Sequence, residues 1–243
     1  MNFERIVYAG HSAVFVETAS CRIAIDPWLQ HNPLCPENLK DPGNIDLIAL
    51  THGHADHASD TPRLAKMTGA RVAATWELSQ IMREEGVAPE QLMPMNKGGS
   101  IEYKGVKVSF THAQHSSSYD TSKGPVYAGE ACGVVLSAGR YSIYHAGDTA
   151  MFSDMELIGE LYRPYIALLP IGDCFTMGPA HAARAAKFIG CRIAIPIHHK
   201  TFDALTGTAE MFRKECSRFD IEVVELLPGE ALSISPQTAA RAA

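Results

Sequence analysis

The sequence lacks several features that mark large classes of proteins. It has no run of eighteen apolar residues, so no segment is expected to form a transmembrane helix. The first residues show no basic segment followed by an apolar block, which argues against a secretory signal. No C-x-x-C pair occurs, and the six scattered cysteines are typical of reduced thiols rather than of a disulfide framework. We therefore expect a soluble, cytoplasmic protein with no membrane partner.

Runs of basic residues are also missing. The chain has 21 Lys and Arg against 27 Asp and Glu, a formal net charge of −6, which argues against binding to duplex nucleic acid. There is no internal repeat, low-complexity block or Pro/Gly/Ser-rich linker. We therefore expect one domain over residues 1–235 and a flexible, small-residue tail over residues 236–243.

Hydrophobic patterns predict strands and helices in both halves of the chain. A nearly continuous apolar run at Ile45–Leu50 is typical of a strand buried on both faces. Thr61, followed by Pro62, predicts the N-cap of a helix, and Gly86 predicts the end of a second helix over 76–85. Further strands are predicted at 6–8, 13–17, 22–25, 106–110, 133–136, 141–144, 166–169, 193–197, 221–225 and 232–234, and further helices at 179–189 and 208–219. Strand groups flanked by helices in each half indicate an α/β fold in which two sheets are covered outside by helices.

The strongest chemical signal is the segment from Thr51 to His57. It holds His52, His54, Asp56 and His57 directly after the predicted buried strand. Imidazole and carboxylate groups suit zinc and neighbouring divalent metals. A turn here can aim the first two side chains at one ion and the last two at another.

Other potential ligands recur at the ends of predicted apolar strands. The strands are followed in turn by His112 and His115, by Asp148, by Asp173 and by His198. Strand ends hold such side chains rigidly, so the recurrence predicts one shared site.

Taken together, these residues resemble the metallo-β-lactamase superfamily. The resemblance rests on His52-x-His54-x-Asp56-His57 followed by His115, Asp148 and His198, and it runs from Gly10 to Gly229. Further segments resemble small metal-dependent hydrolases of bacteria and archaea, a group related to L-ascorbate-6-phosphate lactonase and, more distantly, to N-acylphosphatidylethanolamine phospholipase D. These segments are Gly10-His11-Ser12, Asp26-Pro27-Trp28, His112-Ala113-x-His115-Ser116-Ser117, His145-Ala146-Gly147-Asp148-Thr149, Phe175-Thr176-Met177-Gly178-Pro179 and Ile195-Pro196-Ile197-His198.

The resemblance implies a four-layer αβ/βα sandwich with two divalent metal ions at one edge. His52, His54 and His115 would hold the first ion, and Asp56, His57 and His198 the second, with Asp148 bridging both. A hydroxide held between two such ions could attack a substrate whose oxygen the ions polarise. Zinc is the first expectation for the metal, while Mn, Fe, Ni and Co also suit the donor set.

Catalytic roles are expected for two residues near the ligands. Asp56 has the right chemistry to orient the hydroxide or carry a proton to the leaving group. His11 is expected to contact the substrate or support a ligand, although a simple turn histidine explains it equally well. Four more residues are candidates for supporting the ligands or touching the substrate: His112, Asp173, Thr176 and Lys200, the last through an anionic group.

These expectations lead to a metal-dependent hydrolase acting on an ester, lactone or phosphodiester of a small, anionic metabolite. Two alternatives stay open: a metal-dependent nuclease that processes nucleic acid, and a non-catalytic sensor of metal or ligand. The negative charge argues against the nuclease, and a complete set of ligands argues against the sensor. Whether the protein forms a homo-oligomer is left open.

A possible lid follows the predicted ligand His115. Residues 116–129 show no helical or strand period and are rich in turn-forming residues. They predict either a plain surface connection or a loop whose Tyr119 and Tyr127 cover the bound substrate.

Overall fold

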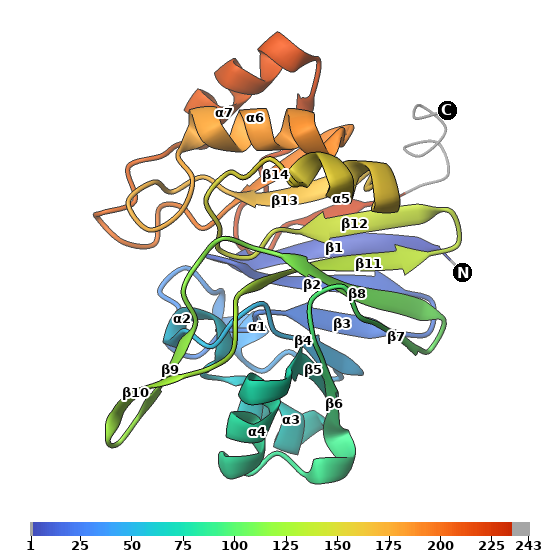
Figure 1. Cartoon of the computed structure of the whole chain (residues 1–243), viewed down its shortest axis with the longest axis vertical. Coiled ribbons are helices and arrows are strands. Elements are labelled where there is room, and N and C mark those ends of the chain that lie inside the picture. Colours follow the sequence, from blue (N-terminus) through green and yellow to red (C-terminus); the bar gives the residue numbers. More distant parts are fainter. Residues whose placement is uncertain (1, 235–243) are drawn as a thin grey trace.

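The computed structural model describes residues 2–234, so the tail predicted at 236–243 lies outside the described residues. The chain forms two seven-stranded sheets and one separate hairpin (Figure 1). The first sheet has the order β16 (Ala231–Ser233), β1 (Phe3–Gly10), β2 (Ala13–Thr18), β3 (Arg22–Ile25), β4 (Leu47–Ala49), β5 (Arg71–Thr75) and β6 (Leu92–Met95). The second has the order β15 (Glu222–Val223), β14 (Ile193–Ile197), β13 (Ile166–Pro170), β12 (Tyr141–His145), β11 (Cys132–Ala138), β8 (Val106–His112) and β7 (Ser100–Tyr103).

Helices cover the outer face of each sheet. In Figure 1, α3 and α4 lie below the first sheet, and α5, α6 and α7 lie above the second. The helices are α1 (Glu37–Lys40), α2 (Ala55–Ala58), α3 (Thr61–Thr68), α4 (Trp76–Glu84), α5 (Met155–Tyr162), α6 (Pro179–Ile189) and α7 (Ala209–Cys216), with short 3-10 turns at Pro89–Gln91 and Ser217–Phe219. No helix in the described part of the chain has the length and apolar character that a bilayer span requires.

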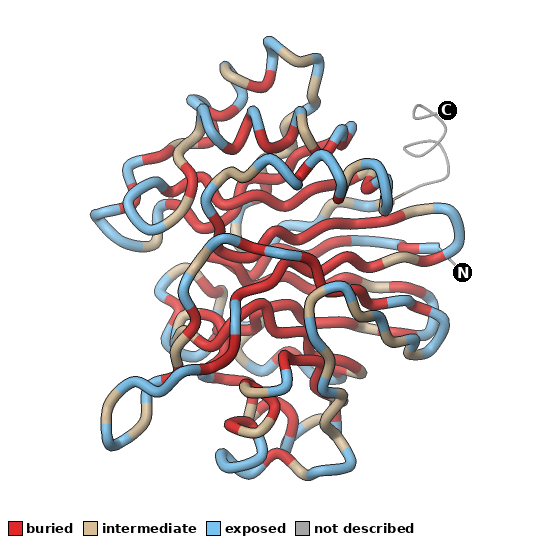
Figure 2. The backbone as a smooth tube through the Cα atoms, in the orientation of Figure 1, coloured by how far each residue is buried: buried red, intermediate tan, exposed pale blue. Residues whose placement is uncertain are grey.

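Three apolar clusters hold these layers together, and Figure 2 shows their residues buried along the strands. One lies between the two sheets and includes Ile23, Phe110 and Ile195. A second packs the first sheet against α3 and α4, and a third packs the second sheet against α5, α6 and α7. This is the predicted four-layer αβ/βα sandwich, because each sheet must bury both of its faces.

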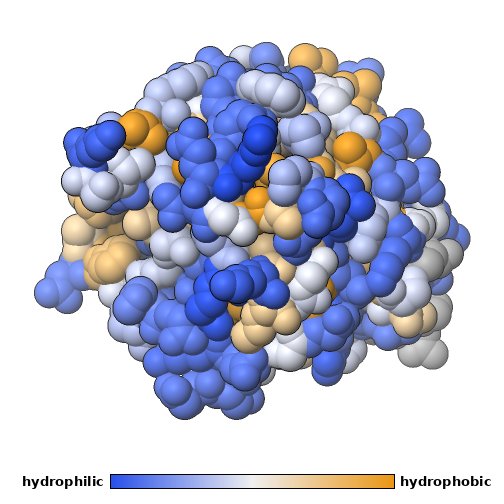
Figure 3. Space-filling model, turned by 90° about the horizontal axis from the view of Figure 1, so that it is seen from below, coloured by the Kyte–Doolittle hydropathy of each residue, from blue (hydrophilic) through white to orange (hydrophobic). Residues whose placement is uncertain are grey.

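The outer surface of the first helix layer is largely polar. Seen from below in Figure 3, it is mostly hydrophilic, with apolar side chains scattered in small groups. Met67 and Trp76 are among the exposed apolar side chains of these helices. Isolated exposed apolar residues of this kind are normal on a globular protein.

The direction of the strands brings the candidate ligands together at one edge of the two sheets. Strands β12, β13 and β14 are parallel, with Ile143 opposite Ile166 and Ile166 opposite Ile193, so their carboxyl ends meet. Strand β8 runs the same way as β12, because each is antiparallel to β11. In the first sheet, β1, β3 and β4 also share one direction. The segments that follow these strands therefore converge.

Two local predictions are corrected by the structure. Helix α3 begins at Thr61, so the N-cap position belongs to Asp60, one residue before the predicted N-cap, and its side chain makes no capping hydrogen bond to the helix. The Asp60 carboxylate accepts hydrogen bonds from the backbone of Leu29 and Gln30, at 2.6 and 2.8 Å, so it anchors the loop after β3.

The second correction concerns residues 116–129, which were predicted to lack strands. They form a hairpin of β9 (Ser118–Thr121) and β10 (Gly124–Tyr127) that projects from the body of the molecule. Tyr119, predicted to cover the substrate, packs into the cluster under the first sheet and is only 7% exposed. Tyr127 is 68% exposed, so only this tyrosine still suits the predicted lid.

Close packing of α5 on α6 predicts the effect of one substitution. A Cβ atom at Gly159 would lie 2.4 Å from the carbonyl oxygen of Ile189, whereas Gly→Ala in an open helix stabilises by about 1 kcal/mol. We expect Gly159→Ala to destabilise the protein by about 1–3 kcal/mol, since the overlap outweighs the helix propensity. Thermal unfolding should show a lower Tm, while Glu160→Ala, at the adjacent exposed position, serves as the control. An unchanged or raised Tm for Gly159→Ala would show that the two helices can move apart.

Candidate metal centre

Three of the predicted ligands form a compact group at the convergent edge. His52 and His54 follow β4, and His115 follows β8. Their ligating atoms lie within 4.8 Å of one another, and His52 Nε2 is 3.0 Å from His54 Nδ1. Ligands of a tetrahedral zinc ion stand about 3.3 Å apart. The three imidazoles are therefore spaced as ligands of one cation.

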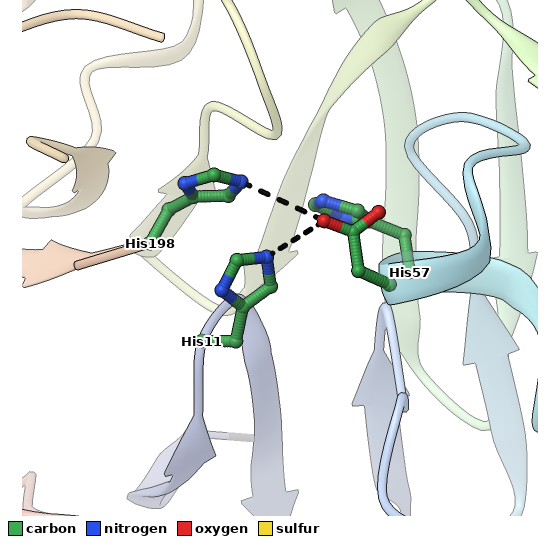
Figure 4. A group of neighbouring side chains, drawn as sticks. His11, His57 and His198 are labelled. Atoms are coloured by element: carbon green, nitrogen blue, oxygen red, sulfur yellow. Dashed lines mark hydrogen bonds and ion pairs between the residues drawn. The ribbon is translucent and has the colours of Figure 1, made fainter. Parts of the chain in front are cut away.

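A second group lies beside the first. His11, Asp56, His57 and His198 also place ligating atoms within 4.8 Å of one another. Figure 4 shows His11 and His198 pointing at one carboxylate oxygen, which belongs to Asp56. The distances to Asp56 Oδ2 are 3.0 Å from His11 Nε2 and 4.0 Å from His198 Nε2.

Asp148 lies between the two groups. Its Oδ2 atom is 3.0 Å from His198 Nε2, 3.4 Å from His57 Nε2 and 3.8 Å from His115 Nε2. The residue is only 3% exposed, and its Oδ1 atom has no hydrogen-bond partner among the described residues. A carboxylate in this position can bind cations held by either group.

Asp26 holds ligands of both groups in place. Its carboxylate accepts hydrogen bonds from Thr51 N at 2.8 Å, Thr51 Oγ1 at 2.6 Å and His57 Nδ1 at 2.8 Å. Thr51 Oγ1 is in turn 3.0 Å from His52 Nδ1. With its hydroxyl proton donated to Asp26, Thr51 accepts from His52, so one carboxylate orients a histidine of each group.

The sequence analysis did not assign this role to Asp26. The sequence did offer one indication: Asp26 directly follows the strand at 22–25, just as the other candidate ligands directly follow apolar strands. Asp26 also has a φ of 47°, which aspartate tolerates better than most residues.

The donor set fits divalent cations. Since His57 Nδ1 donates to Asp26, its Nε2 is the atom left for a ligand, and Nε2 makes no hydrogen bond within residues 2–234. Asp148 Oδ1 is likewise buried without a hydrogen-bond partner in that range. Buried polar atoms are normally paired, so a convergent group of unpaired ones indicates bound cations.

Burial and neighbouring charges set the protonation of the cluster. Burial lowers the pKa of His52, His54 and His115, which keeps these rings neutral and able to bind metal. Burial also lowers the pKa of His57, but the carboxylates of Asp148 and Asp26 outweigh it and raise this pKa well above 6.5.

The two carboxylates of the cluster behave alike. Burial would raise the pKa of Asp148, yet His198 and His57 hold it well below its usual range. Burial would also raise the pKa of Asp56, but the hydrogen bond from His11 and the charge of His57 outweigh this effect and lower the pKa. Both groups are therefore carboxylates at neutral pH.

His11 is built into the site as a buried residue of the turn between β1 and β2. It is fully buried with a φ of 57°, and its Nδ1 is 2.9 Å from Thr201 Oγ1. Its ring lies 3.9 Å, centroid to centroid, from that of His198, and burial lowers its pKa to about 4. These contacts go beyond those of a simple turn histidine.

Three predicted supporting residues are placed elsewhere. His112 is exposed, lies 3.1 Å from Lys97 Nζ and packs edge-on against Phe152. Asp173 is exposed and accepts a hydrogen bond from Cys174 N, not from an imidazole. Lys200 pairs with Glu225 at 3.0 Å, so it does not offer a free cation to an anionic substrate. The structure thus gives these three residues other partners, and their predicted contact with ligands or substrate stays a prediction.

Thr176 keeps a buried hydroxyl that has no hydrogen-bond partner in the described chain. Its backbone N–H lies 3.5 Å from the carbonyl oxygen of Asp173, which places it in the loop after β13. The predicted contact of this residue with ligands or substrate stays a prediction.

A cavity of about 1030 Å³ opens at the opposite edge of the second sheet. It lies where α5 and α6 end and where β13 and β14 begin, and its lining includes Arg163, Gly190 and Arg192. None of the clustered histidines lines it. The metal-ligating chemistry therefore places the candidate site at the convergent edge and not in this cavity.

The shared support by Asp26 predicts the effect of a near-isosteric change. Asp26→Asn keeps the side-chain shape and tolerates the positive φ, but it weakens the acceptor for His57 and Thr51. We expect zinc affinity, measured by competition with a chromophoric chelator, to fall about 10-fold to 100-fold with little change in Tm. Asp41→Asn, at an exposed position, is the matched control. Unchanged affinity in Asp26→Asn would show that the ligands hold their positions without this carboxylate.

Comparison with known proteins agrees with this geometry. Residues 21–199 match the family model described as a beta-lactamase superfamily domain. The chain is 45% identical over 233 residues to a UPF0173 metal-dependent hydrolase of Rubrobacter xylanophilus, covering 94% of this chain and 96% of the relative. A protein of the same name from Methanosarcina mazei is 42% identical over 231 residues, covering 95% and 98%.

A solved structure is similar over nearly the whole chain. Igni18, a metallo hydrolase from the hyperthermophilic archaeon Ignicoccus hospitalis, has a TM-score of 0.86 and 33% sequence identity. The match covers 96% of this chain and 99% of that protein. The chain therefore belongs to the metallo-β-lactamase superfamily and, within it, to the family of UPF0173 metal-dependent hydrolases.

Proposed function

We propose that this protein is a dinuclear metal-dependent hydrolase that cleaves an ester, lactone or phosphodiester of a small molecule. The observation that carries the proposal is the placement of Asp148 between two groups of ligands that each suit one cation. The names of the relatives, which describe metal-dependent hydrolases, support the same class of activity.

The residues assigned to the ions follow from the two groups. His52, His54 and His115 would hold one ion, and Asp56, His57 and His198 the other, with Asp148 shared. Zinc is our first choice, and Mn, Fe, Ni or Co would also suit nitrogen and oxygen ligands. When bound, two such ions supply a water whose pKa falls towards about 7 and a Lewis acid for the substrate oxygen.

Proton transfer is assigned to Asp56. Its side chain is 28% exposed, whereas His57, Asp148 and His198 are nearly inaccessible, so it faces the open side of the site. Its depressed pKa keeps it ionised, so it can accept a hydrogen bond from a water molecule and orient it, and a carboxylate this acidic readily passes a proton on to the leaving group.

His11 positions this carboxylate. Its Nε2 atom is 3.0 Å from Asp56 Oδ2, while Nδ1 faces the hydroxyl of Thr201. Because burial keeps His11 neutral, its single N–H is the one on Nε2 that donates to Asp56, and its Nδ1 accepts a hydrogen bond from the Thr201 hydroxyl. This chain of contacts fixes the ring of His11 and, through it, the rotamer of Asp56.

The proposal is tested by turnover of a library of esters, lactones and phosphodiesters with protein reconstituted with Zn or Mn. We expect Asp56→Ala to lower kcat/KM by at least about 100-fold, because a ligand and a proton carrier are lost together. His11→Ala should lower it less, about 10-fold, with metal content retained. Asp41→Ala should leave it unchanged. Full activity in Asp56→Ala, or no turnover by fully metal-loaded wild-type protein across the library, would refute the proposal.

Metal uptake should also release protons. His57 carries a proton at pH 7 in the metal-free protein because its pKa is raised, whereas the lowered pKa values of His52, His54 and His115 leave them neutral. A cation must displace the His57 proton, so zinc binding at pH 7 should release at least about one proton per chain. Affinity should therefore rise with pH up to the pKa of His57. Calorimetry in buffers of different ionisation enthalpy measures this release, and an absence of buffer dependence would contradict it.

A further inference from the structure

Two aromatic side chains, Trp28 and Phe202, form an aromatic wall beside the second group of ligands. The ring of His11 lies 5.3 Å from that of Trp28 and 5.5 Å from that of Phe202, and the last two rings are 6.1 Å apart. Trp28 is only 8% exposed, whereas Phe202 is 40% exposed. A phenyl ring thus reaches the surface next to the histidine that contacts Asp56.

Local contacts hold this wall in place. Phe202 follows Thr201, whose hydroxyl meets His11 Nδ1 at 2.9 Å, and the Phe202 carbonyl accepts a hydrogen bond from Leu205 N at 2.9 Å. The same loop is tied to the loop after β13 by Gly207 N donating to Gly172 O at 3.1 Å. The ring is therefore presented by a segment whose position is coupled to the catalytic residues.

The charged groups of this loop face other partners. Lys200 is paired with Glu225, which also contacts Arg213 at 3.4 Å. The accessible group beside His11 is therefore the aromatic ring of Phe202 and not an unpaired lysine.

We propose that Phe202 and Trp28 form a subsite for an aryl ring, and this proposal rests on the proposed function. The ring would be attached to the carbonyl or phosphoryl group that reacts beside Asp56. An aryl ring packed on Phe202 would cover a phenyl surface now in water, and aromatic pairs gain further from edge-to-face contact. The substrate is then an aryl or arylalkyl carboxylic ester or phosphodiester whose ring lies on the His11 side of the site.

The test compares two metal-binding probes that differ only by a phenyl group. Zinc-loaded full-length protein is titrated calorimetrically with acetohydroxamate and with phenylacetohydroxamate. We expect the phenyl compound to bind at least about tenfold more tightly, as burial of a phenyl ring requires. Phe202→Ala should remove this preference without changing the affinity for acetohydroxamate or the zinc content, and Phe202→Leu should retain part of it.

Leu161→Ala, which removes an exposed apolar side chain from α5, is the matched control and should keep the full preference. Equal affinity of the two probes for wild-type protein, or an unchanged preference in Phe202→Ala, would overturn the subsite while leaving the metal centre intact. Failure of both probes to bind zinc-loaded protein would instead show that the bound zinc accepts no ligand from solution, which would overturn the proposed function and the subsite with it.

Discussion

Burial of ionisable groups at the convergent edge is the constraint on which the rest of the site depends. Asp26, His57 and Asp148 are almost completely removed from water, yet they carry charge or unpaired lone pairs. Such burial is costly unless opposite charges or cations compensate it. In the metal-free protein, the raised pKa of His57 between the carboxylates of Asp26 and Asp148 favours a positive charge on this ring, which supplies part of that compensation. Bound cations would supply more, and the geometry of the remaining unpaired atoms suits them.

The sandwich makes this burial possible. Strands of one direction in each sheet end at the same edge, so short loops from β1, β3, β4, β8, β12 and β14 can supply donors to one small volume. The two sheets are also joined at the site itself. His198 N, after β14, donates to His11 O, after β1, at 2.7 Å, and His145 Nε2 donates to Ser12 O at 2.9 Å. Ligands from both halves are therefore held in one rigid frame.

The outer parts of the site differ in character from this frame. Proposed ligands such as His52, His57 and His198 are buried, whereas Phe202 and Tyr127 are accessible. Variation at such accessible positions can change the substrate without disturbing the ligands. This separation explains why the ligand pattern alone identifies the superfamily and leaves the substrate to the surrounding loops.

The sequence by itself determined many of the strands and helices and indicated the candidate ligands, because apolar periodicity and strand-end chemistry are local properties. The strands at 22–25 and 193–197 and the helix at 179–189 have the predicted bounds, and every predicted ligand lies in one of the two groups or, as Asp148, between them. Only the tertiary structure decided which way loop side chains face. His112, Asp173 and Lys200 turn to other partners, Tyr119 enters the core, and Asp26 and Thr201 prove to hold the histidines. These choices depend on contacts between segments far apart in the chain, which no local pattern encodes.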